Sequence, residues 1–266
     1  MNKQSNNAQL VPAPILNYSG SVRKIAKKCI TVVKKHQVKV RPESLSGDAP
    51  KDFIYVYEYG KLNCKKANPK SWVPYIAKVG HKWYPTESIT EHLITRLGQE
   101  WGFNLANSKL YIFSGQLRYC SEFFTKLDQE LVHGADILAR YLDEADSDFI
   151  EQIDKRGWSQ ELLTFNFVKE AIENIFPNYA EEIVGELINM LIFDALVGNN
   201  DRHFFNWGVI RHLKENRRPY FSPIYDTARG LFWNYSDKRL LELTKNSDQK
   251  AERIASYNNK TKPKIG

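Results

Sequence analysis

The sequence predicts an α+β fold with two lobes, a strand-rich N-terminal lobe and a mostly helical C-terminal lobe. Short apolar segments of strand length dominate up to about residue 124, and longer helical segments follow up to about residue 197. With 266 residues, 42% of them hydrophobic and 13% aromatic, the chain can build one large or two modest domains with a substantial core. We expect a basic arm over residues 1–40, an N-terminal lobe over 41–124 and a C-terminal lobe over 125–266.

Most of the positive charge lies at the start of the chain. Residues 1–42 contain seven Lys, two Arg and no acidic residue, so this segment carries +9 within a chain of net charge +7, and the remainder carries −2. Between residues 22 and 41, lysine pairs interrupt short apolar groups, a pattern that suits an amphipathic helix or a pair of strands. Such a helix could bind nucleic acid, an anionic surface or an acidic partner; a solvated basic face packed on its own domain is the simpler alternative.

Composition also bounds the class of protein. No apolar run is long enough to span a bilayer, and residues 1–10 are polar where a signal peptide would be apolar. We expect a soluble, cytoplasmic protein without a membrane span, with secretion as an effector as an alternative. The cysteines are widely separated and indicate neither a disulfide framework nor a zinc site: Cys29, Cys64 and Cys120.

The first element of the N-terminal lobe is a loop of small residues before a strand. Residues 41–51 read Arg-Pro-Glu-Ser-Leu-Ser-Gly-Asp-Ala-Pro-Lys, and a strand-like segment follows at 53–59. The hydroxyls of Ser44 and Ser46 and the backbone of Gly47 could bind a phosphate. An ordinary turn fits the same composition equally well.

The next predicted strand covers residues 72–79 and is apolar except for Lys78. A lysine in a buried strand needs an anionic partner, because an unpaired buried ammonium is costly. That partner could be a carboxylate or a ligand phosphate. Alternatively, the lysine reaches solvent at a strand edge.

A helix then begins near Pro85, and its predicted buried face is an apolar stripe of Ile89, Leu93, Leu97 and Trp101. Glu91 lies off this stripe and could therefore meet Lys78. A capping box from Ser88 to Glu91 is the structural alternative for the same carboxylate.

Two strands at 109–115 and 116–124, around a tight turn at Ser114-Gly115, complete the lobe. Helices are predicted at 135–142, 161–176 and 179–197. The last helix stops at Gly198, and a dense polar cluster follows it: Asn199, Asn200, Asp201, Arg202, His203 and, after two phenylalanines, Asn206. Asp194, inside the helix, is expected to tie this loop down by hydrogen bonds.

Beyond the cluster, strands at 207–211 and 220–225 form a predicted hairpin that places Asn206 and Asp226 at its two ends, where they can converge. Phosphoryl transfer from ATP needs a group that orients the acceptor hydroxyl and oxygen ligands for Mg²⁺. Asp201 suits the first role, and Asn206 with Asp226 suits the second; His203 is a second candidate base. Taken singly, each residue also has a structural interpretation: a turn former, a satisfied core histidine or the start of a strand.

These motifs resemble those of the HipA-like serine/threonine kinases, including their CtkA-type bacterial members. Gly-Asn-Asn-Asp-Arg-His-Phe-Phe-Asn-Trp-Gly at 198–208, followed by Pro-Ile-Tyr-Asp at 223–226, is similar to the catalytic and metal-binding loops of that family. The Asp-Arg-His-x-x-Asn core is also similar to that of phosphoinositide 3-kinases. Upstream, residues 44–51 resemble the family's phosphate loop, 75–78 its lysine strand and 90–92 the start of its glutamate helix.

The resemblance implies a bilobal protein-kinase-like fold and a role for each matching residue. Lys78 would bind the ATP phosphates and Glu91 would hold Lys78, while Asp201 would be the catalytic aspartate and Asn206 with Asp226 would bind Mg²⁺. Adenine would contact a hinge at 121–124, including Glu122 and Phe123. Ser44 and Ser46 are the matching candidates for inhibitory autophosphorylation, because a phosphoserine adds about −1.5 to −2 charge where the ATP phosphates should bind.

The sequence departs from the family pattern in two places. Thr227-Ala228 follows Asp226 where protein kinases have Phe-Gly, and only 40 residues follow Asp226, so an abbreviated C-terminal lobe is one interpretation. The leading hypothesis is an ATP- and Mg²⁺-dependent kinase of protein Ser/Thr, acting as a toxin with an antitoxin or regulatory partner, or as an effector. The alternatives are a nucleotide-binding pseudokinase whose basic arm recruits nucleic acid or a partner, and a lipid kinase.

Overall fold

The computed structural model describes residues 30–41, 51–80, 86–113, 115–144, 147–214, 217–261 and 263–266. Ser44, Ser46, Gly47, Cys29 and most of the basic arm lie outside the described residues. The chain divides into two compact units. Unit 1 comprises residues 1–97, 106–123 and 232–252, and unit 2 comprises 98–105, 124–231 and 253–266.

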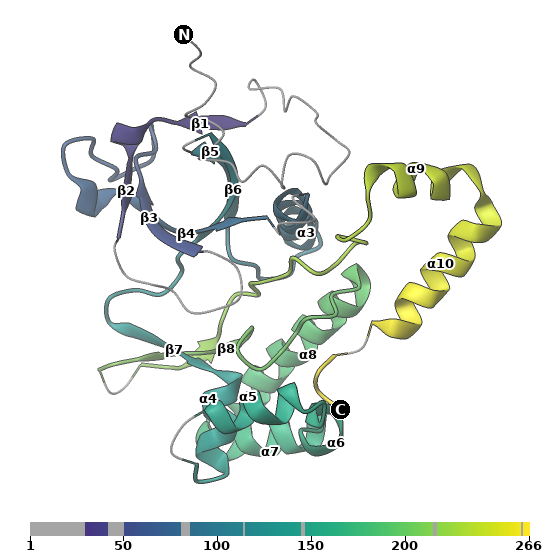
Figure 1. Cartoon of the computed structure of the whole chain (residues 1–266). Helices are drawn as coiled ribbons and strands as arrows, with labels where there is room; N and C mark the ends of the chain where they lie inside the picture. Colours follow the sequence, from purple (N-terminus) through teal and green to yellow (C-terminus); the bar gives the residue numbers. More distant parts are fainter. Residues whose placement is uncertain are drawn as a thin grey trace. The chain divides into compact units, whose positions relative to one another are not determined.

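Unit 1 is built on a curled six-stranded sheet with the order β1-β5-β6-β4-β3-β2 (Figure 1). β1 pairs in parallel with β5, and the other neighbours are antiparallel. Its core contains aliphatic and tyrosine side chains from the inward face of these strands, including Ile54, Val73 and Tyr75. The strands are β1 (Thr31–Val33), β2 (Val38–Val40), β3 (Lys51–Val56), β4 (Val73–Val79), β5 (Ser108–Phe113) and β6 (Gln116–Glu122).

The described part of the predicted basic arm is not helical. β1 and β2 flank a short 3₁₀ helix, η1 (Lys35–Gln37), and both strands join the same sheet as β3 to β6. The helical alternative for this stretch is therefore wrong over residues 30–41, and the strand alternative is confirmed there. Val33 is buried against the core, which explains why the apolar residues between the lysine pairs form strands. A second 3₁₀ helix, η2 (Pro69–Ser71), precedes β4.

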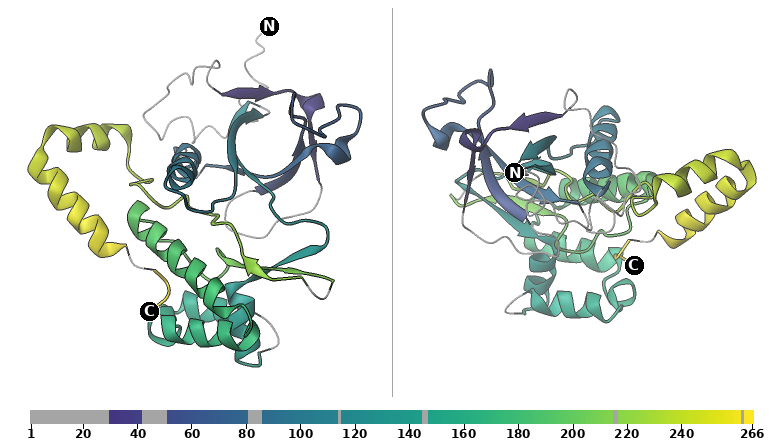
Figure 2. Two further views of the ribbon diagram at one scale, coloured as in Figure 1. Left: turned by 180° about the vertical axis from the view of Figure 1, so that it is seen from behind. Right: turned by 45° about the horizontal axis from the view of Figure 1, so that its top comes forward.

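Helix α3 (Glu87–Glu100) lies beside the sheet in both views (Figure 2). The stripe predicted to be buried faces outward instead, since Ile89, Leu93 and Trp101 are 40%, 49% and 51% exposed. Glu91 and Thr95 are 2% exposed, because they find polar partners on β4 and β6. The capping-box interpretation is also wrong: the helix begins at Glu87, and the carbonyl of the preceding threonine accepts its first hydrogen bonds.

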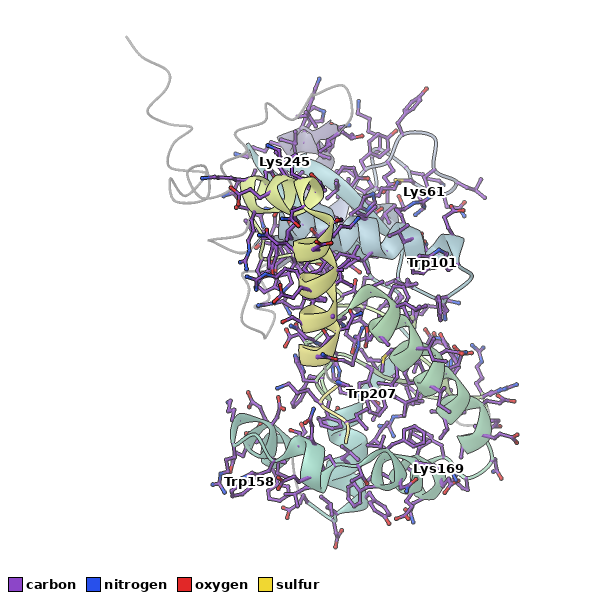
Figure 3. The ribbon with its side chains drawn as sticks, turned by 90° about the vertical axis from the view of Figure 1, so that its right-hand side faces the viewer. Lys61, Trp101, Trp158, Lys169, Trp207 and Lys245 are labelled. Carbon is purple, nitrogen blue, oxygen red and sulfur yellow. The ribbon has the colours of Figure 1, made fainter. Side chains whose placement is uncertain are left out.

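Unit 2 joins a three-stranded sheet of order β7-β8-β9 to a group of helices. Apolar side chains of α4, α7 and α8 form its core, including Leu138, Ile172 and Leu187. Trp207 is also inside this unit and stacks on Phe221 with ring centroids 5.9 Å apart, whereas Trp158 is 46% exposed at the surface (Figure 3). The elements are β7 (Gln129–His133), β8 (Gly208–His212), β9 (Tyr220–Phe221), α4 (Gly134–Tyr141), α5 (Asp148–Lys155), α6 (Ser159–Leu162), α7 (Phe165–Ile175) and α8 (Ala180–Val197).

Two further helices complete the chain, α9 (Asp237–Lys245) and α10 (Ser247–Lys260). α10 continues from the range of unit 1 into that of unit 2. Within the described ranges, no helix combines the length and apolarity needed to cross a bilayer.

Candidate active site

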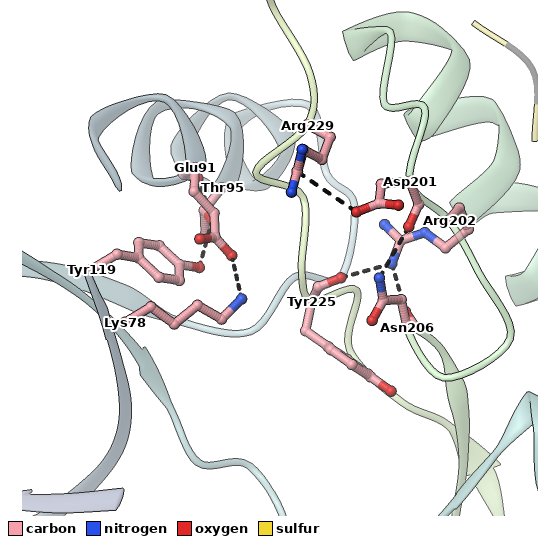
Figure 4. Close-up of polar contacts among 9 residues, drawn as sticks. All are labelled: Lys78, Glu91, Thr95, Tyr119, Asp201, Arg202, Asn206, Tyr225 and Arg229. Carbon is pink, nitrogen blue, oxygen red and sulfur yellow. Dashed lines mark hydrogen bonds and ion pairs between the residues drawn. The ribbon is translucent and has the colours of Figure 1, made fainter. Parts of the chain in front are cut away.

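In unit 1, the predicted pair of Lys78 and Glu91 is formed. Lys78 Nζ, on β4, lies 3.1 Å from Glu91 Oε1, on α3, and the two side chains are 13% and 2% exposed (Figure 4). The lysine also lies 5.8 Å from the centre of the Tyr119 ring. The strand-edge alternative for Lys78 is therefore wrong. An ion pair this deeply buried is weak evidence for a contribution to stability, because removing both charges from water offsets their attraction.

The predicted hinge residues Glu122 and Phe123 have their backbone N–H groups engaged within unit 1. Glu122 N–H donates to Asn107 O at 2.7 Å, and Phe123 N–H donates to Pro74 O at 2.9 Å. The Glu122 carboxylate forms an ion pair with Lys61 at 3.1 Å. An adenine ring bound at these two residues would therefore have to use their carbonyl oxygens or the exposed part of Phe123.

In unit 2, the polar loop begins where α8 stops. Gly198 adopts a left-handed conformation, with φ of 67°, and its N–H donates to Asp194 O. A Cβ at this position would lie 2.3 Å from the Tyr257 ring, so both the backbone angle and the packing require glycine. The chain can therefore leave the helix sharply and place Asp201 three residues later.

Arg202 holds this loop together from inside. It is 1% exposed, and its guanidinium donates to both Asp194 carboxylate oxygens, at 2.6 and 2.9 Å. The same group donates to Asn206 O at 2.5 Å and to Tyr225 O at 2.7 Å. Burial alone would lower the pKa of Arg202, but the charge of Asp194 and the hydrogen bonds to it raise that pKa above its ordinary value. Asp194 ties down the loop, as its position predicted.

Tyr225 connects the predicted loop at residues 223–226 to the polar loop that follows α8. Its hydroxyl donates to Phe205 O at 3.0 Å and lies 3.1 Å from His133 Nδ1, while its carbonyl accepts from Arg202. Asp226 follows directly and has a positive φ of 56°, a conformation that aspartate tolerates better than most residues. The Arg202 guanidinium therefore binds the backbone at both ends of the hairpin, at Asn206 and at Tyr225, the residue before Asp226.

Asp201 lies where several charges meet. Its side chain is 43% exposed, and its Oδ2 is 3.7 Å from Arg229 Nε (Figure 4). The pKa of Asp201 is raised by partial burial and by the nearby Asp226 carboxylate, although His203 and Arg229 oppose this shift. Asp201 and Asp226 are thus close enough for their charges to interact.

His203 is held in one orientation by its own loop. Its Nδ1 accepts the N–H of Phe205 at 3.2 Å, so the proton of the neutral ring is on Nε2. Burial lowers the pKa of His203, which favours this neutral form. Since Nδ1 is occupied and Nε2 carries the proton, the ring as placed is a hydrogen-bond donor and a poor proton acceptor.

The predicted metal ligands form an incomplete set that suits Mg²⁺. Asn206 Nδ2 donates to Asp201 O at 3.0 Å. The other polar atom of the amide, Oδ1, is the one that could bind a metal. Within the described part of the chain, no cluster of three or more His, Cys, Asp or Glu could hold a metal by itself. Mg²⁺ is usually bound by one or two carboxylates plus water and phosphate oxygens, so Asn206 and Asp226 fit a metal that arrives with a nucleotide.

Sequence reasoning missed the residues that position the loops, which are Arg202, Tyr225, His133 and Tyr257, and it also missed Arg229, which pairs with Asp201. For Arg202 a signal was available, because a charged residue between two predicted site residues, eight positions after an aspartate in a buried helix, needs an internal partner. The others lie outside any local pattern, since their contacts come from segments far apart in the sequence.

Comparison with known proteins agrees with this description. The sequence profile of the HipA-like C-terminal domain matches residues 43–265. The structure is similar to the crystal structure of the Helicobacter pylori proinflammatory kinase CtkA, with a TM-score of 0.64 and 18% identity over 85% of this chain and 69% of that one. At this identity the similarity shows the fold alone, and it confirms the predicted α+β kinase-like architecture.

A second solved structure, HipA from the toxin-antitoxin system of Shewanella oneidensis MR-1 with HipB and its operator DNA, is more distant. It matches with a TM-score of 0.43 and 17% identity over 70% of this chain and 44% of that one. No match was found among curated protein sequences. The family profile nevertheless covers most of the chain and confirms the resemblance read from its motifs: the chain belongs to the HipA-like C-terminal domain family.

Proposed function

We propose that this protein is an ATP- and Mg²⁺-dependent kinase that phosphorylates serine or threonine in a protein. The observation that carries the proposal is the loop arrangement in unit 2. Asp201 is solvent-accessible and close enough to Asp226 for their charges to interact. The buried Arg202 binds the backbone of both loops, at Asn206 and at Tyr225. A rigid set of oxygen ligands beside an accessible carboxylate is what phosphoryl transfer requires.

In the proposed reaction, Asp201 accepts a hydrogen bond from the acceptor hydroxyl and orients its oxygen toward the γ-phosphorus of ATP. A new bond forms between that oxygen and phosphorus, and the bond from phosphorus to the β–γ bridging oxygen breaks. ADP leaves with the electron pair of the broken bond, and the hydroxyl proton passes to the Asp201 carboxylate. Asp201 is preferred over His203 as the acceptor, because the free nitrogen of His203 already carries a proton.

Asn206 Oδ1 and the Asp226 carboxylate would hold the metal in this reaction. Mg²⁺, when bound there, would neutralise negative charge that develops on the phosphate oxygens. Lys78 would bind the phosphates, and the ion pair with Glu91 would hold its ammonium in place.

Replacing Lys78 with methionine is expected to weaken ATP binding by roughly 10- to 100-fold, because a charge-assisted hydrogen bond contributes about 1.5–3 kcal/mol. Isothermal titration of the full chain with Mg·ATP measures the loss. Lys70→Met, at an exposed position in the same unit, is the matched control and should bind like wild type. Equal affinity of the Lys78→Met variant and this control would remove Lys78 from the nucleotide site.

The direct test of function is transfer of label from [γ-³²P]ATP with Mg²⁺, using the protein itself, dephosphorylated casein and phosphoinositide vesicles as acceptors. Label on protein serine or threonine that disappears with EDTA supports the proposal. Label on lipid alone would instead assign a lipid kinase. Tight ATP binding without transfer to any acceptor would indicate a nucleotide-binding module.

We further propose that the protein phosphorylates itself in the loop at residues 42–51, at Ser44 or Ser46. Support comes from the resemblance of that loop to the family's phosphate loop. After incubation with Mg·ATP, mass spectrometry should find phosphate on a peptide spanning this loop, and phosphate only on other peptides would reject both serines. An antitoxin or regulatory partner is also proposed, from membership of the HipA-like family.

A further inference from the structure

Arg229 is a charged residue at the candidate site to which the proposed reaction assigns no role. It follows Asp226 by three positions, and its guanidinium forms the ion pair with Asp201 at 3.7 Å (Figure 4). The two side chains are 33% and 43% exposed. An ion pair this exposed is screened by solvent and contributes little to stability, so exchanging the carboxylate for another anion costs little.

The backbone of Arg229 is anchored to the same loop that carries Asp201. Leu231 N–H donates to Val197 O, in the last turn of α8, at 2.9 Å. Tyr257 OH, on α10, donates to Gly198 O at 2.7 Å and lies 3.4 Å from Arg229 O. Thr227 and Ala228, between Asp226 and Arg229, are buried. The backbone of the segment is therefore fixed at both ends, and the side chain of Arg229 extends from it to Asp201.

The distance from Arg229 to Asp201 limits where its guanidinium can act. If Asp201 binds the acceptor hydroxyl, the hydroxyl oxygen lies about 2.6–3.2 Å from the carboxylate. The phosphorus lies roughly 3–3.5 Å beyond that oxygen in a reactive arrangement. A guanidinium that contacts the Asp201 carboxylate therefore lies within side-chain reach of the transferred phosphoryl group.

We infer that Arg229 is a further catalytic residue, which leaves Asp201 and donates hydrogen bonds to the oxygens of the γ-phosphoryl group during transfer. This inference rests on the proposed kinase function. In the free protein Arg229 balances the charge of Asp201. During transfer its planar set of N–H donors stabilises the charge on the phosphoryl oxygens, and no bond to Arg229 forms or breaks.

The Arg229→Gln variant distinguishes contact with the transferred phosphoryl group from a role in which Arg229 only positions Asp201. A contact made only in the transition state lowers kcat and leaves the KM for ATP nearly unchanged. We expect kcat to fall by roughly 10³-fold or more, as for other arginines that contact a transferred phosphoryl group. Arg211→Gln removes an arginine from another partly exposed ion pair of unit 2, with Glu130 at 2.7 Å, and is the matched control.

A transition-state analogue provides the second measurement. ADP with Mg²⁺ and aluminium fluoride mimics the transferred group, so Arg229→Gln should weaken binding of this complex while binding of Mg·ADP stays as in wild type. Guanidinium ion should restore part of the activity of Arg229→Ala, whereas urea, which is uncharged, should not.

The inference is overturned if Arg229→Gln keeps a kcat within a few-fold of Arg211→Gln, or if it weakens Mg·ADP as much as the aluminium fluoride complex, as would the loss of a residue that only positions Asp201. If the proposed kinase function itself is wrong, the wild-type protein transfers no phosphate to any acceptor, and this result distinguishes the two cases.

Discussion

Phosphoryl transfer by an Asp201→Asn variant is expected to be slower than wild type by roughly 10²- to 10⁴-fold, the usual contribution of a positioned acid–base group. Asparagine keeps the size of the side chain and one acceptor oxygen, but it carries no charge and cannot accept the hydroxyl proton. The backbone of the loop should be unchanged, because the contact of residue 201 with Asn206 is made through its carbonyl oxygen. Affinity for Mg·ATP should therefore stay close to the wild-type value.

His203→Gln is the informative companion, because His203 is the competing candidate for the base. Its Nδ1 accepts the Phe205 N–H, and the side-chain oxygen of glutamine offers a similar acceptor. We expect a smaller loss of kcat than for Asp201→Asn. Near-normal transfer by Asp201→Asn together with an inactive His203→Gln variant would reverse the assignment.

Both variants should be measured in one assay, with single-turnover transfer from [γ-³²P]ATP and nucleotide affinity determined separately. A loss of rate at unchanged affinity identifies a role in the chemical step. A parallel loss of nucleotide affinity would instead mean that Asp201 belongs to the phosphate or metal site, and would contradict its proposed role.

Much of this arrangement follows from local patterns in the sequence. The antiparallel strands β5 and β6 meet at a glycine with φ of 79°, and β8 and β9 form the predicted hairpin. The pairing of Lys78 with Glu91 could be anticipated because a charge in an apolar strand must find an opposite charge. In each case one physical requirement of a short segment dominates.

Prediction failed where two elements compete for the same surface. By periodicity the better buried face is the apolar stripe that begins on α3 and ends just after it: Ile89, Leu93, Leu97 and Trp101. The helix nevertheless turns Glu91 and Thr95 inward, because Lys78 and Tyr119 on the sheet offer these side chains polar partners. A single segment carries no information about the polar groups of the element it packs against, so periodicity alone could not identify this face.

The residues that position the loops of unit 2 could not be predicted from short sequence segments either. Tyr225 is held by Phe205 and His133, which lie 20 and 92 positions away in the sequence. Tyr257 reaches Gly198 across 59 positions. Such contacts exist only after the helices and the hairpin have packed together.

Arg202→Met is expected to destabilise unit 2 by about 3–5 kcal/mol, the usual result of removing one partner from a buried ion pair. The Asp194 side chain is 5% exposed and would keep only its hydrogen bond from Asn199, at 2.9 Å. The carbonyls of Asn206 and Tyr225 would lose their shared donor as well. Urea unfolding of the full chain, followed by circular dichroism, measures the change.

Arg211→Met is the matched control, because it removes an arginine from a pair whose side chains are 42% and 45% exposed. Such a pair contributes at most about 1 kcal/mol. The double variant Asp194→Leu, Arg202→Met tests the cause: with no charge left buried, it should lose less stability than the two single variants together. If Arg202→Met unfolds at the same urea concentration as Arg211→Met, the buried pair does not hold the two loops together. The loops would then owe their arrangement to the hairpin and to Tyr225.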